Sequence, residues 1–233
     1  MNATVIDSHF LSTHFNENLN IVADSLMEAM IWSIKNSREL TIKQLSFDHT
    51  SLPDSLSCPL VLLPLQLIYH RGEIHVAGVE KESLETVIMS IMQIGEYSLS
   101  NEMFQRQIYE QHFKKELKKR FGITSNIDRK VHHIKLEFSP LTGHFVKNHH
   151  WHPTEKWTES ESGNPILHLH CGINRELVGW IFKWMRNVRV LEPKVLRDLV
   201  IAESKSVIEH YEDPKPLESV NVYRQKYLPP TDV

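Results

Sequence analysis

The chain has 233 residues, of which 41% are hydrophobic and 24% charged, and its formal net charge is −3. These values describe an ordinary globular protein with one large or two small domains, and they argue against a dedicated DNA-binding domain, which usually carries a basic surplus. Cys58 and Cys171 lie far apart in apolar surroundings, which favours reduced thiols. No apolar run reaches the roughly 20 residues of a membrane span, and the amino terminus lacks the form of a signal peptide. We therefore expect a cytoplasmic protein.

The first hundred residues predict one helix followed by strands. Residues 1–17 are mixed and polar, which indicates a flexible amino terminus. From Asn18 onwards apolar residues recur at helical spacing, which predicts an amphipathic helix. One helix before about four short antiparallel strands is enough for a small, strongly bent sheet or barrel, which we place at 18–98. The expected strands span 40–47, 60–69, 73–79 and 84–94, with a bend at Pro64 and a tight turn at Arg71-Gly72.

The segment 99–130 is expected to be a linking helix and a linker. It carries the densest basic run of the chain, and Gly122 stands where a helix C-cap glycine belongs. A solvated helix face explains the run most simply, because cations suit the negative end of the helix dipole. Contact with the phosphates of a nucleic acid is the alternative. The candidate contact residues are Lys114, Lys115, Lys118, Lys119 and Arg120.

The last hundred residues predict a second domain at 131–212. Its patterns follow the order strand, helix, strand, strand, helix, strand, which is the ferredoxin-like β-α-β-β-α-β order. An extra helix opens at Pro193, since proline is tolerated in the first turn. Residues 213–233 contain four prolines and are expected to be extended. The expected elements are strand 134–138, helix 141–146, a hairpin of 149–157 with 166–171, helix 176–184 and strand 188–191.

Three sequence motifs in this second domain form a recognisable series. They are Trp151-His152-Pro153, the helical stretch Trp180–Trp184, and Val190-Leu191-Glu192-Pro193 followed by Leu196-Arg197. This series resembles the C-terminal extension of the WYL-domain family of bacterial transcription regulators. The resemblance implies a winged helix-turn-helix, a small Sm-like or SH3-like barrel called the WYL domain, and a ferredoxin-like extension. The chain would thus be α+β, with the barrel at 18–98.

The family signature differs in this chain. Where the family has Trp-Tyr-Leu after a glycine turn, the chain has Ile74-His75-Val76, and Gln93 stands at the position of an arginine. The resemblance implies that the polar face of the barrel binds nucleic acid or nucleotide-like effectors. Glutamine at the arginine position removes a permanent cation and its bidentate fork. The candidate ligand-binding residues are Tyr69, Arg71, His75, Ser90 and Gln93.

Histidine is the one overrepresented reactive residue, with 15 copies. His149, His150 and His152 lie together, and His168 and His170 share one face of a strand. Against a zinc site, neither cysteine has a partner at CxxC spacing and no His-Glu-x-x-His helix is present. We expect no metal and no cofactor. No nucleophile elbow, P-loop, dinucleotide fingerprint or acid pair is present, so we expect no enzyme.

The resemblance therefore predicts a WYL-type transcription regulator, or its effector-sensing and dimerising portion, that acts by shifting between arrangements. The partners expected are a second copy and a nucleotide or oligonucleotide effector. Trp151, Trp157, Trp180 and Trp184 suggest the dimer, because tryptophan is enriched at interfaces.

About 17 residues precede the first helix, whereas a winged helix needs roughly 60–80 on ordinary small-domain sizes. Two readings follow: the chain is part of a longer regulator, or it lacks a DNA reader. DNA would then be contacted only through a separate or missing winged helix. The alternative function is a non-DNA-binding interaction or oligomerisation module that modulates a partner regulator.

Overall fold

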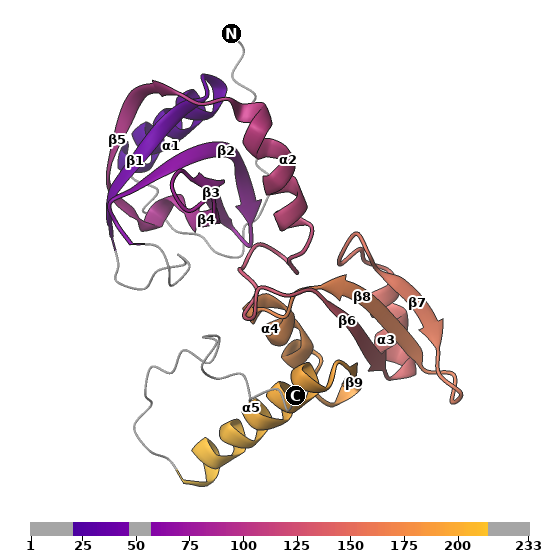
Figure 1. The fold of residues 1–233 in the computed structure, drawn as a ribbon. Coiled ribbons are helices and arrows are strands. Elements are labelled where there is room, and N and C mark those ends of the chain that lie inside the picture. Colours follow the sequence, from indigo (N-terminus) through magenta and orange to yellow (C-terminus); the bar gives the residue numbers. More distant parts are fainter. Residues whose placement is uncertain (1–20, 47–56, 214–233) are drawn as a thin grey trace. The chain divides into compact units, whose positions relative to one another are not determined.

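The computed structural model describes residues 21–46 and 57–213. These residues form an α+β structure with two antiparallel sheets and five α-helices (Figure 1). The chain divides into two compact units, Met1–Phe113 and Lys114–Val233. The predicted α+β class is therefore confirmed. None of the helices in the described ranges is both long and apolar enough to cross a membrane.

The described part of the first unit contains one helix, a five-stranded sheet and the start of a second helix. The strands pair in the order β4-β3-β2-β1-β5, and the strand pairs found among the described residues leave this sheet open rather than closed into a barrel. The elements are α1 (Ile21–Lys35), β1 (Arg38–Leu45), β2 (Leu60–His70), β3 (Glu73–Glu80), β4 (Thr86–Ser90), the 3-10 turn η1 (Ile91–Gln93), β5 (Ile94–Met103) and α2 (Arg106–Leu117).

Local sequence explains the β2–β3 hairpin. Arg71 and Gly72 both have positive φ, 50° and 88°, as a two-residue turn between twisted antiparallel strands requires. The predicted bend at Pro64 is also present, because the β2–β3 register shifts between Pro64 and Gln66. Gly78 lies opposite Pro64, and a Cβ there would come within 2.2 Å of the Leu63 carbonyl oxygen. The bulge therefore depends on glycine at position 78.

Two sequence expectations were wrong at the end of this sheet. The strand expected at 84–94 is broken, because β4 stops at Ser90 and η1 turns the chain into β5. Residues 99–103, expected in the linking helix, extend β5, where Leu99 pairs with Leu40 and Met103 with Arg38. Their strand conformation depends on β1, which lies some sixty residues earlier, so no local pattern announces it.

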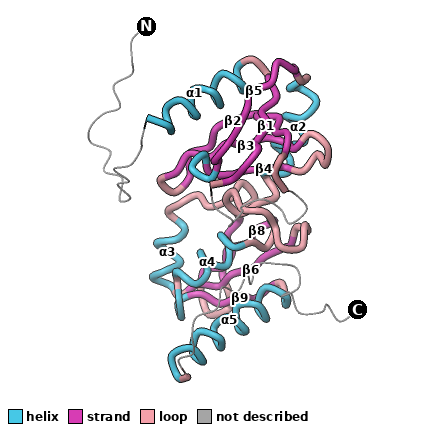
Figure 2. Tube along the Cα trace, turned by 90° about the vertical axis from the view of Figure 1, so that its left-hand side faces the viewer, coloured by secondary structure: helices cyan, strands magenta, loops and turns pink. Residues whose placement is uncertain are grey.

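The core of the first unit lies between α1 and one face of the sheet. Figure 2 shows α1 running alongside this sheet. The opposite face of β2 and β3 is also buried, at Leu63, Leu65, Ala77 and Val79. The start of α2 is attached to β2, since Arg106 donates through Nη2 to the Leu65 carbonyl at 2.6 Å. Buried residues of the α1 core include Leu26, Met30, Leu40, Ile42, Leu62, Val76, Val87 and Met89.

The second unit builds a four-stranded antiparallel sheet with the order β7-β8-β6-β9. The predicted hairpin is present as β7 and β8, but residues 149–155, expected in its first strand, precede β7. The elements are β6 (His132–Phe138), α3 (Pro140–Lys147), β7 (Lys156–Glu159), β8 (Pro165–Cys171), α4 (Arg175–Lys183), the 3-10 turn η2 (Met185–Asn187), β9 (Val188–Glu192) and α5 (Lys194–Glu212).

A tryptophan cluster forms part of the core of this unit. Trp180 is 5% exposed, and its ring centroid lies 5.0 Å from that of Trp151 and 5.8 Å from that of Trp184. Phe138 contacts Trp157, with ring centroids 6.2 Å apart. Because these tryptophans pack inside one unit, their abundance no longer supports a dimer. Leu196 and Leu199 attach the first half of α5 to the same core, beside β9.

Candidate functional site

The first candidate site lies on β3 and β4 of the first unit. His75 is the direct cross-strand neighbour of Ser90, and on its other side it pairs with Ile68 of β2. Directly paired residues point to the same face of a sheet, so His75 and Ser90 lie side by side. The structure thus brings together two of the residues that the sequence singled out.

His75 is held in a largely buried position. Its side chain is 13% exposed, its Nε2 lies 4.0 Å from a carboxylate oxygen of Glu73, and its ring meets His70 edge-on at 6.2 Å between centroids. Burial lowers the pKa of His75, although Glu73 partly opposes this effect. Nδ1 is buried and makes no hydrogen bond of normal geometry among the described residues. The lowered pKa favours the neutral form of the ring, whose Nδ1 is enclosed by the protein.

Ser90 and Gln93 are joined by a capping box. The Ser90 hydroxyl accepts from the Met92 amide at 3.3 Å, and the Gln93 side-chain oxygen accepts from the Ser90 amide at 3.3 Å. A regular strand would point these two side chains in opposite directions, but the end of β4 at Ser90 brings them together. Gln93 therefore helps to end strand β4, which is a structural role.

Tyr69 and Arg71 do not join this group. Tyr69 pairs with Ile74, so its side chain points to the face opposite His75, and it is 68% exposed. Arg71 occupies the hairpin turn. Of the five candidate ligand residues, three gather around the β4 end and two lie at the tip of the β2–β3 hairpin.

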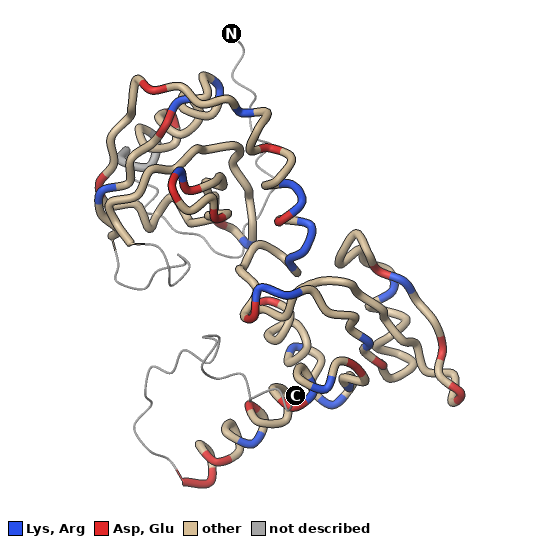
Figure 3. The backbone as a smooth tube through the Cα atoms, in the orientation of Figure 1, with Lys and Arg blue, Asp and Glu red and all other residues tan. Residues whose placement is uncertain are grey.

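The basic run lies at the end of α2 and just beyond it, where Figure 3 shows Lys and Arg gathered. Lys114, Lys115 and Lys118 are exposed. Lys119 forms an ion pair with Glu116, and Arg120 donates through Nη1 to the Ile123 carbonyl at 2.9 Å. Lys119 and Arg120 therefore have partners within the chain.

The backbone after α2 is anchored by His152. Its Nε2 lies 3.1 Å from the Lys118 carbonyl oxygen, and its Nδ1 lies 2.8 Å from the Thr154 hydroxyl. The ring is 3% exposed, and burial lowers its pKa. The histidine of the Trp-His-Pro motif is thus a structural residue that joins two segments of the second unit.

Protonation of His152 should weaken the fold. Its folded pKa lies below the ordinary value near 6.5, so the unfolded chain binds more protons in that range. Stability is therefore full above about pH 6.5 and decreases as the pH falls. Urea unfolding at pH 7.5 and pH 5.5 should show this loss. The His152→Gln variant, whose amide does not titrate, should lose less of its free energy of unfolding between these two pH values. An identical pH dependence in both proteins would contradict this role of His152.

A buried carboxylate was missed by the sequence reading. Glu176 accepts from the amides of Ile123 and Thr124 at 2.7 and 2.9 Å, and from the Thr124 hydroxyl at 2.7 Å. A Cβ at Gly122, where φ is +74°, would lie 2.3 Å from this carboxylate. The prediction that Gly122 caps a helix is wrong, because α2 ends at Leu117, and this glycine instead makes room for Glu176. All three bonds go to Oε1 of this carboxylate, which thereby holds the segment after α2.

The remaining histidines form no metal centre in the parts of the chain that the structure describes, where no group of three His, Cys, Asp or Glu has suitable geometry. Nε2 of His168 lies 2.7 Å from the Thr158 hydroxyl oxygen. The ring centroids of His168 and His133 are 5.7 Å apart. His170 is exposed on the same strand.

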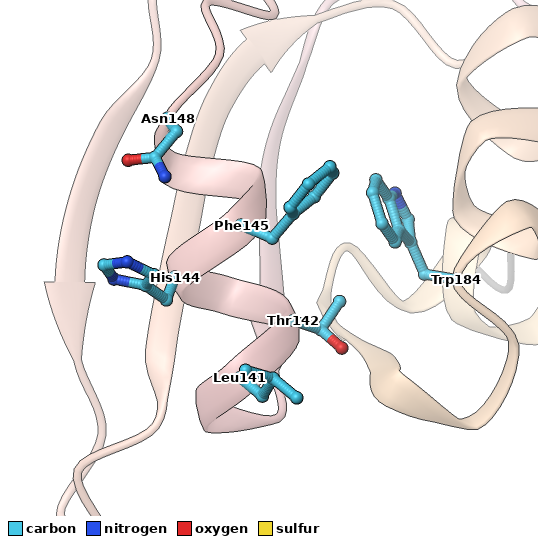
Figure 4. Close-up of a pocket in the computed structure, with 6 residues that line it drawn as sticks. All are labelled: Leu141, Thr142, His144, Phe145, Asn148 and Trp184. Atoms are coloured by element: carbon cyan, nitrogen blue, oxygen red, sulfur yellow. The ribbon is translucent and has the colours of Figure 1, made fainter.

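Two surface grooves occur in the second unit. In the smaller, of about 410 Å³, Phe145 of α3 faces Trp184 across the opening, as Figure 4 shows. The larger, of about 530 Å³, lies between α4, β9 and α5. The surface of both is mainly apolar, so they suit packing or apolar ligands. The smaller groove is lined by Leu141, Thr142, His144, Phe145, Asn148 and Trp184.

Comparisons with known proteins find a family match over part of this chain. The family model of the WCX domain matches residues 130–208. Among solved structures, proteasome accessory factor B/C (PafBC) of Arthrobacter aurescens is similar at 13% identity and a TM-score of 0.37, over 84% of this chain and 28% of that one. A CRISPR Cas-related protein is similar at 11% identity and a TM-score of 0.53, over 82% of this chain and 53% of that one.

The chain therefore spans about a quarter to a half of the length of these two solved structures. No curated protein matches it. The match at 130–208 covers β6 to α5, including the Trp-His-Pro segment and the tryptophan cluster. Residues 130–208 thus match the WCX domain family, and the predicted resemblance to the C-terminal extension of WYL-type regulators is confirmed there.

Proposed function

We propose that this chain is the effector-sensing and dimerising portion of a WYL-type transcription regulator, with a regulatory rather than a catalytic role. The WCX match at 130–208 is the observation that carries the proposal. PafBC and the CRISPR Cas-related protein enter only as similar structures. DNA would be contacted only through a separate winged helix.

The finer fold assignment is part of this proposal. In the second unit the strand order β7-β8-β6-β9, with a helix after β6 and another after β8, supports a ferredoxin-like domain. In the first unit one helix precedes five antiparallel strands, and β1 pairs with both β2 and β5. That arrangement supports an Sm-like or SH3-like sheet.

An effector site at His75 would explain how the regulator senses a ligand. His75 combines partial exposure with a buried nitrogen that lacks a hydrogen bond of normal geometry, next to the Ser90 position. A base or sugar of a nucleotide offers the donors and acceptors that such a ring recognises. Binding would favour one arrangement of the regulator over another, since a ligand shifts an equilibrium by its differential affinity.

A thermal-shift screen with cyclic nucleotides and short oligonucleotides tests this function. A ligand at 100 times its Kd should stabilise the folded state by about 2.7 kcal/mol and raise Tm. His75→Ala should remove the shift, while Thr158→Ala in the other unit should retain it. A screen with no shift, or a shift that His75→Ala leaves unchanged, would refute the site.

The alternative is an interaction module without an effector, which modulates a partner regulator. The capping box favours it, because Gln93 replaces the cation that the family resemblance implies and is already used to end β4. If no ligand in the screen raised Tm and the chain still formed a stable oligomer, this second function would be supported.

Duplex DNA should bind weakly and without sequence preference. Net charge is −3, and three exposed lysines at the end of α2 can neutralise few phosphates. We expect a Kd of about 10⁻⁴–10⁻⁶ M that weakens steeply with salt. In fluorescence anisotropy, Lys115→Glu/Lys118→Glu/Lys119→Glu should abolish binding, whereas the matched change Lys35→Glu/Lys147→Glu/Lys205→Glu should reduce it less. Tight binding that survives raised salt would contradict this expectation.

A further inference from the structure

The sheet of the second unit has one buried face and one face with exposed side chains. Ile134, Leu136 and Leu169 point to the buried face, where α3 packs against β6 and β8 (Figure 1). Side chains alternate between the two faces along a strand, so the residues between them point outwards. Four of the outward residues on β6 and β8 carry imidazole or ammonium groups, namely His133, Lys135, His168 and His170.

The strand register places these four side chains at the corners of one rectangle, the histidine–lysine cluster. His133 pairs directly with His170, and Lys135 pairs directly with His168. Directly paired side chains lie about 5 Å apart, and side chains two residues apart on one strand lie about 7 Å apart. The ring centroids of His133 and His168, on one diagonal, are 5.7 Å apart. A group the size of a phosphate can therefore reach several of the four side chains at once.

The outer strands of the sheet orient two of the rings. The Thr158 hydroxyl oxygen on β7 lies 2.7 Å from Nε2 of His168. A carboxylate oxygen of Glu192 on β9 lies 3.5 Å from Nδ1 of His133, and the other lies 2.9 Å from Nζ of Lys135. These contacts use one nitrogen of each ring and do not involve Nδ1 of His168 or Nε2 of His133. Both of those nitrogens are donors once the rings are protonated, so the cluster can offer oriented donors to an anion.

The charges around the cluster favour an anionic ligand. Lys156 on β7 pairs with His168 and extends the row of basic side chains across the sheet. Glu192 faces the cluster from β9, and Glu137 on β6 is held by Arg189. Once the histidines are protonated, cations outnumber anions on this face. Like charges opposite each other destabilise a sheet, so strand pairing does not account for the cluster, whereas a bound anion would relieve the repulsion.

We propose that this face of the second unit binds the terminal phosphate of a small phosphorylated ligand. The phosphate accepts hydrogen bonds from the imidazolium groups of His133 and His168 and pairs with Lys135. A terminal phosphate carries nearly two negative charges at neutral pH, whereas each phosphate diester of a nucleic-acid backbone carries one. A compact group of cations therefore favours the terminal phosphate. The site lies in a different unit from His75, so it does not depend on the effector site proposed there.

Affinity for a phosphate monoester should be highest near about pH 6. Burial, His133 and Lys135 lower the pKa of His168, so this ring gains its charge below the ordinary value near 6.5. Binding should therefore strengthen as the pH falls through that range. Below about pH 6 the monoester itself becomes singly charged, which should weaken binding again. Sulfate, which remains a dianion, should instead bind more tightly as the pH continues to fall.

NMR titration of the full chain with glycerol phosphate and with inorganic phosphate tests the site. Backbone amide signals of β6 and β8 should shift, with a Kd of about 1 mM at about pH 6. His133→Gln/His168→Gln should weaken binding at least about tenfold, as expected when hydrogen bonds to a charged group are lost. His144→Gln/His149→Gln alters two exposed histidines of another surface, and this matched control should leave the Kd unchanged. Circular dichroism at the same pH establishes that each variant is folded.

A single-stranded oligothymidylate without terminal phosphates separates the two sources of phosphate. It presents only diesters and should bind at least about tenfold more weakly than glycerol phosphate. Equal binding would make the cluster a nucleic-acid surface and would overturn the proposal. So would a titration without amide shifts well above the expected Kd, or shifts that persist in His133→Gln/His168→Gln. The effector site is tested separately, because His75→Ala should leave the binding of glycerol phosphate unchanged.

Discussion

Replacing Glu176 with alanine should destabilise the second unit by about 3–5 kcal/mol, because three buried or half-buried donors lose their acceptor at once. The donors are the amides of Ile123 and Thr124 and the Thr124 hydroxyl. Of its attachments to α4, the segment that follows α2 would keep the bonds that Asn174, the N-cap residue of α4, donates to the Phe121 and Thr124 carbonyls. Urea unfolding followed by tryptophan fluorescence measures the loss, since all but one of the five tryptophans lie in this unit.

Two variants control this result. Glu176→Gln keeps one carbonyl acceptor and should cost less than the alanine change. Glu161→Ala alters an exposed glutamate of the same unit and should stay within about 0.5 kcal/mol. If Glu176→Ala were as stable as Glu161→Ala, the carboxylate would not hold the segment.

Trp180→Ala should lower the free energy of unfolding by about 3–5 kcal/mol, because removing a large aromatic side chain leaves a cavity in the core. The ring contacts Trp151, Trp184 and Phe138. Its indole Nε1 is buried and has no hydrogen-bond partner among the described residues. Trp180→Phe therefore gives up no hydrogen bond and should cost no more than about 1.5 kcal/mol.

Trp151→Phe is the matched comparison. The Trp151 Nε1 donates to the Val146 carbonyl at 2.8 Å, so phenylalanine there leaves a carbonyl without its donor. We expect Trp151→Phe to cost more than Trp180→Phe by about 1 kcal/mol. Equal costs in chemical denaturation would show that packing alone, and not the indole hydrogen bond, governs this cluster.

Local sequence predicts those elements that depend on residues close by in the chain. The helix α1, the Arg71-Gly72 turn and the β7–β8 hairpin each depend on neighbours a few residues away, so periodicity and turn chemistry predict them. The WCX segment is equally visible, because its motifs are contiguous. For the candidate site, the sequence identified His75 and Ser90, and the pairing of β3 with β4 put them side by side.

Other features needed the folded chain. Residues 99–103 become a strand only because β1 is available to pair with them, and Glu176 accepts from amides about fifty residues away. The tryptophans were read as an interface from their abundance, but their contacts with each other fill a core, and α5 is left as the exposed apolar surface. The sequence by itself determined the elements and the motifs, since these depend on short-range sterics and spacing. Tertiary structure decided which side chains meet and which stay exposed, since burial depends on partners distant in the chain.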